Sequence, residues 1–159
     1  MNISKIVGCA SVIAFSALLG YFYSQKEMKK LHLCEEIYLF LRKLEYGIGK
    51  RIPLNDIISG HMSVVKPRYL VGNNKDELVK CLGGFKNDGI CAEPIQLCEE
   101  LLDTVGKSPD GGEQQKRCGM TADRVAEMLC AMRGECGNKK DLYPKLGVIL
   151  GILVCITVI

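Results

Sequence analysis

Charged residues are almost absent from both ends of this 159-residue chain. Outside residues 24–145 the sequence contains a single charged residue, Lys5. The positive mean hydropathy of +0.12 comes from these two ends, which argues against a simple soluble globule. The middle holds nearly all of the 21 basic and 18 acidic residues, and a formal net charge of only +3 excludes a strongly basic nucleic-acid binder. We therefore expect no nucleic-acid partner.

Catalytic and metal-binding motifs are also missing. The nine cysteines include no C-x-x-C pair, so the closely spaced ligands of a structural zinc site are not present. Neither G-x-S-x-G nor H-E-x-x-H occurs. Gly106-Lys107-Ser108 resembles the end of a phosphate-binding loop, but Leu101 stands where that motif requires glycine. We predict no enzyme activity, no catalytic or metal-binding residues and no cofactor.

The first apolar run is Ile6–Tyr23, 18 residues without a charge. As a helix it spans about 27 Å, close to the hydrocarbon thickness of a bilayer. Aromatic residues at its end are followed by lysines, as is typical of a membrane interface. The sequence thus predicts an N-terminal transmembrane helix over 1–24. The alternative is a cleaved export signal with Ala14-Phe15-Ser16 as its cleavage site.

The second apolar run is Leu146–Ile159, 14 uncharged residues that span about 21 Å as a helix. Leu142 and Tyr143 extend it, with Pro144 near the helix start or at a kink. We predict a C-terminal membrane segment over 142–159, because a helix that is apolar on every face needs burial all round. A buried core helix is the alternative.

Positive charges predict the orientation of both segments. Seven lysines and arginines lie near their inner ends, whereas only Lys5 and the amino terminus lie outside. The region 25–141 is therefore expected in the cytoplasm, with its lysines near anionic lipid. Small residues recur four apart in each segment, a spacing that lets helices approach closely in a membrane. The predicted helix-packing residues are Ser16, Gly20, Gly147 and Gly151.

The region 25–141 shows helical periodicity and no strand-like alternation, which predicts an all-α antiparallel helical bundle. The first helix is expected to continue from the membrane segment to about Tyr46, where Gly47 and Gly49 end it. A loop broken by Gly60 and Pro67 follows the second helix. The later helices are expected at 53–59, from 75 after an Asn74 cap, from 93 to a Gly106 C-cap, and at 113–132 after a turn over 107–112.

Three groups of residues resemble the stage III sporulation protein AB family. The first group is Leu41-Arg42-Lys43-Leu44-Glu45 with Ile48, Pro53-Leu54 and Ile57-Ile58. The second is Leu102, Gly106, Ser108, Asp110 and Gln114, where the chain departs from the family's turn by an inserted Pro109. The third is Lys145-Leu146-Gly147 with Gly151. These groups follow the family's order along nearly the whole chain.

The resemblance implies a membrane-anchored structural component of the secretion-like channel complex between mother cell and forespore. Its bundle is expected to be similar to the cytoplasmic domain of the type II secretion F protein. It would dock a cytoplasmic ATPase and other membrane subunits, at the mother-cell membrane facing the forespore. The resemblance indicates Arg42, Glu45, Asp110 and Gln114 as partner-binding residues. A membrane-tethered, cysteine-dependent redox or metal-sensing protein is the alternative.

Overall fold

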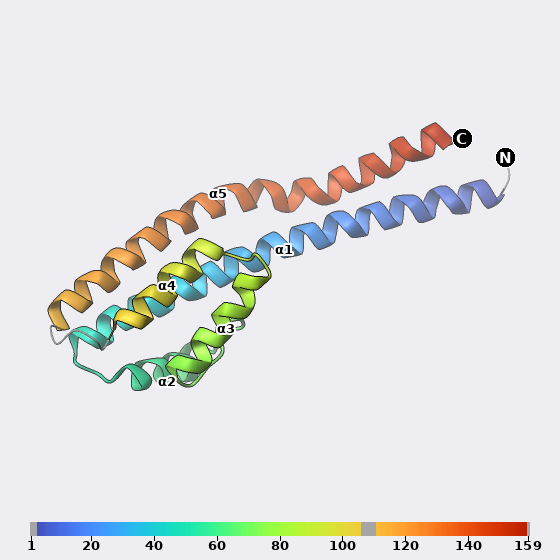
Figure 1. Ribbon diagram of the computed structural model, residues 1–159. Coiled ribbons are helices and arrows are strands. Elements are labelled where there is room, and N and C mark those ends of the chain that lie inside the picture. The colour runs from blue at the N-terminus through green and yellow to red at the C-terminus, as the bar shows by residue number, and fades with distance from the viewer. Residues whose placement is uncertain (1–2, 106–110, 159) are drawn as a thin grey trace. The chain divides into compact units, whose positions relative to one another are not determined.

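The computed structural model describes the backbone of residues 3–105 and 111–158, and the side chains within 8–105, 111–137 and 142–157. Within these ranges the chain is all-helical, which confirms the predicted all-α class (Figure 1). The helices are α1 (Ile3–Gly49), α2 (Leu54–Val65), α3 (Lys75–Asn87), α4 (Ala92–Thr104) and α5 (Gly111–Val158).

The chain divides into two compact units. One, here called the helix pair, combines Met1–Leu31 with Met132–Ile159, and the other, here called the bundle, is His32–Ala131. The helix pair thus contains the beginning of α1 and the end of α5. The bundle contains the rest of both helices together with α2, α3 and α4.

The bundle has an apolar core whose positions on α1 recur at three- and four-residue spacing, as the sequence predicted. Cys34, Ile37 and Leu41 are fully buried there. α3 packs against both α4 and α2. The remaining helices, and Leu70 between α2 and α3, close the core with these buried side chains: Ile57, Ile58, Leu70, Leu78, Leu82, Ile95, Cys98, Leu102, Cys118, Ala122 and Val125.

The second helix is longer than the sequence predicted. It was expected to end at Ser59 before a break at Gly60, but α2 continues through Gly60 to Val65. The burial of His61 one residue later explains the difference, because tertiary packing overrides the weak helix preference of a single glycine. α2 ends where Pro67 disfavours the helical conformation at the preceding residue. Lys66 accordingly turns left-handed, with φ of 48°.

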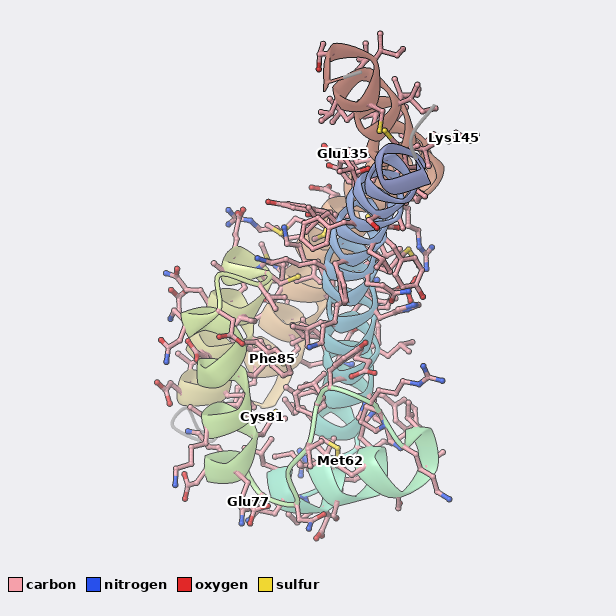
Figure 2. All side chains as sticks on the ribbon, turned by 90° about the vertical axis from the view of Figure 1, so that its right-hand side faces the viewer. Met62, Glu77, Cys81, Phe85, Glu135 and Lys145 are labelled. Carbon is pink, nitrogen blue, oxygen red and sulfur yellow. The ribbon has the colours of Figure 1, made fainter. Side chains whose placement is uncertain are left out.

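The cap of α3 agrees with the prediction. The Asn74 side chain accepts a hydrogen bond of 2.9 Å from the Glu77 N–H, and the Glu77 carboxylate accepts one of 2.9 Å from the Asn73 N–H. Cys81 and Phe85 follow Glu77 along one face of α3 at four-residue spacing (Figure 2). Both side chains contact Tyr69. The Cys81 thiol donates to the Tyr69 carbonyl oxygen at 3.1 Å, and the centres of the Phe85 and Tyr69 rings are 6.2 Å apart.

The ends of α4 and α5 correct three predictions. α4 begins at Ala92, one residue before the expected start, while Gly106 and most of the predicted turn lie outside the described residues. Gly111 and Gly112 were assigned to that turn but form the first turn of α5. α5 was expected to end at Met132 and instead runs through Pro144 to Val158.

No helix within the described residues carries a stretch that is both long and apolar enough to cross a membrane. Among the described residues, the structure therefore does not show the transmembrane helix predicted over 1–24 or the membrane segment predicted over 142–159.

Candidate functional site

The predicted small residues meet along one contact in the helix pair. A Cβ atom on Gly147 would overlap the carbonyl oxygen of Ser16. A Cβ on Gly151 would overlap the Ser16 hydroxyl and lie 2.9 Å from the Ile13 Cα. The structure therefore brings Ser16, Gly147 and Gly151 together, with no room for a side chain at either glycine.

Gly20 lies one turn further along α1 in the same contact. A Cβ there would lie 3.0 Å from the carbonyl carbon of Tyr143 and 3.2 Å from the Pro144 Cα. Backbone therefore approaches backbone at Gly20, directly beside Pro144. We call this contact, made by Ser16, Gly20, Gly147 and Gly151, the small-residue seam.

Two thiols extend the seam in both directions, which the sequence did not predict. The Cys155 Sγ lies 3.4 Å from the carbonyl oxygen of Cys9, and the Cys136 Sγ lies 3.8 Å from that of Glu27. As residue numbers rise along α1 they fall along α5, so the two helices of the pair run antiparallel. Cysteine suits such a seam because its side chain is small and only weakly polar.

The rest of the helix pair exposes large apolar side chains. Phe15 and Phe22 are each 66 % exposed, and Ile156 is 68 % exposed. The full set comprises Val12, Phe15, Leu18, Leu19, Tyr21, Phe22, Tyr23, Leu142, Leu146, Val148, Ile149, Leu150, Ile152, Leu153, Val154 and Ile156. Contiguous exposed apolar surface of this extent marks a contact with a partner or a lipid phase. We call it the apolar surface of the helix pair.

Arg42 and Glu45 take part in contacts within the bundle. The Arg42 guanidinium donates to Glu45 at 2.9 Å and to Asp123 on α5 at 2.6 Å. It also lies 5.5 Å from the Tyr38 ring centre, and its hydrogen bonds to Tyr38, Glu45 and Asp123 raise its pKa. Glu45 in turn packs on Gly119, where a Cβ would lie 2.8 Å from its Oε1. Both residues thus tie α1 to α5.

The other two predicted partner-binding residues are Asp110 and Gln114. Asp110 lies outside the described residues. Gln114 is half-buried near the start of α5, nine residues before Asp123 and thus roughly 13 Å from it along the helix axis. Of the four predicted partner-binding residues, the structure thus brings Arg42 and Glu45 together.

The buried thiols are poor nucleophiles. Burial raises the pKa of Cys34 and of Cys98 to about 12, and that of Cys118 to about 11. These thiols therefore stay protonated near neutral pH, whereas the thiolate is the reactive form. Among the side chains that the structure places, no three histidine, cysteine or acidic residues are grouped to hold a metal ion.

The bundle buries a polar side chain, His61, whose burial the sequence did not predict. His61 is 1 % exposed, and neither ring nitrogen has a hydrogen-bond partner among the described residues. Its ring packs edge-on against Phe40, with 5.5 Å between the ring centres. Burial lowers its pKa, and the nearby positive charge of Lys43 lowers it further. The imidazole is therefore neutral at physiological pH.

No known protein family, curated protein or solved structure matches the chain.

Proposed function

We propose that this chain is a non-catalytic assembly component of a membrane complex. The helix pair attaches it to the membrane, and the bundle binds partner proteins. The apolar surface of the helix pair is the single observation that carries this proposal.

The packing inside the helix pair supports membrane attachment. Helices in water bury their large apolar side chains against each other, whereas helices in lipid associate through small residues and backbone contact. The helix pair follows the second pattern, because Gly147 and Gly151 form its seam while Phe15 and Phe22 face outward. The lysines that follow the first apolar run favour a bundle on the cytoplasmic side.

The resemblance to the stage III sporulation protein AB family supports a narrower proposal. The complex would be the secretion-like channel between mother cell and forespore. The bundle, by analogy with the type II secretion F protein, would dock the cytoplasmic ATPase and neighbouring membrane subunits. The chain would then lie in the mother-cell membrane facing the forespore.

The buried cysteines disfavour a redox or metal-sensing role, the second candidate function. Thiols with a pKa of about 11 to 12, such as those of Cys98 and Cys118, are held in their unreactive form. Cys130 is the exposed cysteine among the described residues. Its exposure places it outside the core, and no other observation indicates a redox or metal-binding role for it.

Topology reporters test the proposal. The reporter is a protein that is active only in the cytoplasm, fused either after residue 30 or after Ile159. It should be active after residue 30 and inactive after Ile159. Affinity purification of the full chain from sporulating cells should then recover the cytoplasmic ATPase of the complex. Equal reporter activity at both positions, or recovery of the chain without the ATPase, would count against the assignment.

A further inference from the structure

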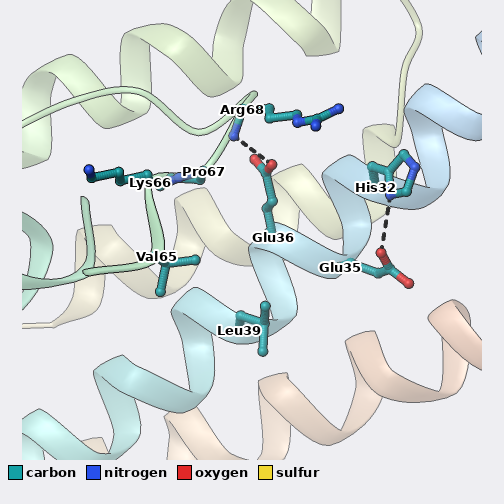
Figure 3. Close-up of a pocket in the computed structure, with 8 residues that line it drawn as sticks. All are labelled: His32, Glu35, Glu36, Leu39, Val65, Lys66, Pro67 and Arg68. Carbon is teal, nitrogen blue, oxygen red and sulfur yellow. Dashed lines mark hydrogen bonds and ion pairs between the residues drawn. The ribbon is translucent and has the colours of Figure 1, made fainter. Parts of the chain in front are cut away.

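The bundle contains a pocket of about 370 Å³ between α1 and the segment that follows α2 (Figure 3). One wall is a single face of α1, because residues 32, 35, 36 and 39 recur at three- and four-residue spacing. The end of α2 and the chain after it form the other wall. The lining residues are His32, Glu35, Glu36, Leu39, Val65, Lys66, Pro67 and Arg68.

Glu36 fixes the second wall in place. Its carboxylate accepts three successive backbone hydrogen bonds, from Arg68 at 2.7 Å and from Tyr69 and Leu70 at 2.9 Å each. These bonds bind a segment more than thirty residues away in sequence to α1. A carboxylate with several N–H donors forms strong, charge-assisted bonds. The pocket is therefore a preformed feature, and the negative charge of Glu36 is already compensated.

The other charged side chains at the pocket differ in whether they already have an ion-pair partner. Glu35 lies 3.3 Å from the His32 ring and is thereby partnered within the wall. Lys66 and Arg68 are exposed, and neither has an ion-pair partner among the described residues. Two cations at the rim are thus available to a ligand, while both carboxylates are engaged.

An apolar area lies beside these cations. Leu39 is 48 % exposed and Val65 is 42 % exposed, and both line the pocket. A pocket with an apolar wall and a guanidinium at its edge is complementary to a ligand that carries an apolar group next to a carboxylate.

We propose that this pocket binds an acidic, amphipathic segment of a partner protein. A carboxylate of the segment pairs with Arg68, and a neighbouring aliphatic side chain packs on Leu39 and Val65. The inference rests on the proposed function in one respect: it takes the partner to be a protein. It places docking at this pocket, apart from Arg42 and Glu45, which are engaged in tying α1 to α5.

Binding of a designed peptide to the full chain in nonionic detergent tests this proposal. The probe is a fluorescein-labelled helical peptide with leucine at three- and four-residue spacing, flanked by glutamate, and its twin carries lysine in place of glutamate. The acidic peptide should bind saturably and the twin should not. Arg68→Glu should weaken binding at least about tenfold, because it replaces an attractive charge pair with a repulsive one. Leu39→Glu should weaken it similarly.

Lys80→Glu is the matched control, since Lys80 is an exposed lysine of the bundle outside the pocket, and it should change binding less than about twofold. Far-ultraviolet circular dichroism should show the same helicity for all variants. Equal binding of both peptides, or full binding by Arg68→Glu, would overturn the proposal. So would Arg68-dependent binding of phosphatidylglycerol vesicles without peptide binding, which identifies a lipid headgroup site. None of these results bears on the topology test above, so the two proposals fail separately.

Discussion

At the scale of single residues, His61 is the least expected feature of the bundle. A buried polar group without a hydrogen bond destabilises a fold by about 1 to 3 kcal/mol, and both ring nitrogens of His61 are in that position. The sequence offered no signal for it, because Gly60 marked the expected end of the helix just before it. The burial of His61 also makes the stability of the bundle depend on pH.

We predict that the bundle loses stability as the pH falls below about 6.5, the ordinary pKa of histidine. The pKa of His61 is lower in the folded chain, because of burial and Lys43, although Glu36 acts in the opposite direction. The unfolded chain therefore binds a proton more readily, and acid favours unfolding. The stabilisation is complete above pH 6.5 and is lost as the pH falls towards the folded-state pKa.

Denaturant unfolding at pH 7.5 and pH 5.5 measures this effect in the full chain in detergent. His61→Leu should remove most of the difference between the two pH values. His32→Gln, at an exposed histidine, should leave the difference in place. An unchanged pH dependence in His61→Leu would show that other groups cause it.

Thiol reactivity provides a second prediction at this scale. In the folded chain at pH 8, iodoacetamide should alkylate Cys130, which is exposed, and should spare Cys34 and Cys98, whose pKa is about 12. The reason is that alkylation requires an accessible thiolate. Mass spectrometry of proteolytic fragments identifies the alkylated positions, with a denatured sample as the control. Rapid alkylation of Cys98 in the folded chain would contradict the prediction and favour a thiol-based function.

At the scale of elements, the small-residue seam is the contact on which the helix pair depends. Gly147→Leu should separate α5 from α1, because a side chain there would overlap the Ser16 carbonyl. Gly134→Ala is the matched control on the same helix, since nothing lies within 4 Å of a Cβ at that position. It should stabilise α5 by about 1 kcal/mol through higher helix propensity.

Thermal unfolding in detergent, followed by circular dichroism, distinguishes these variants. We expect a lower midpoint for Gly147→Leu and an unchanged or higher midpoint for Gly134→Ala. If both variants unfold at the same temperature as the natural chain, the seam does not stabilise the helix pair.

The Glu36 carboxylate is the second contact between elements that can be tested directly. Glu36→Gln removes the charge that holds the N–H groups of Arg68, Tyr69 and Leu70. Hydrogen exchange at these three amides should accelerate, while amides in the middle of α4 keep their rates. Glu35→Gln is the control, since Glu35 bonds to the exposed His32. Unchanged exchange in Glu36→Gln would mean that other contacts fix the segment.

At the scale of the whole molecule, local patterns in the sequence predicted much of the bundle and little of its long-range contacts. The helical periodicity of the region 25–141 predicted its helices, and Asn74 predicted the start of α3. These features depend on neighbours within one or two turns, so the sequence displays them directly.

Features that depend on distant residues were missed. Pro144 was expected near a helix start or at a kink, but α5 begins at Gly111, so the proline does not lie at a helix start. Glu36 accepts hydrogen bonds from backbone more than thirty residues away, and no local pattern indicates this contact. Tertiary contacts of this kind are not encoded in local spacing.

Membrane extraction tests the central claim most directly. The full chain should sediment with membranes and resist alkaline carbonate, whereas Leu18→Lys combined with Leu150→Lys should weaken this attachment, because charge on a lipid-facing position is costly. Val71→Lys, at an exposed apolar residue of the bundle, should behave like the natural chain. Recovery of the natural chain as a monomer in the soluble fraction would contradict the account.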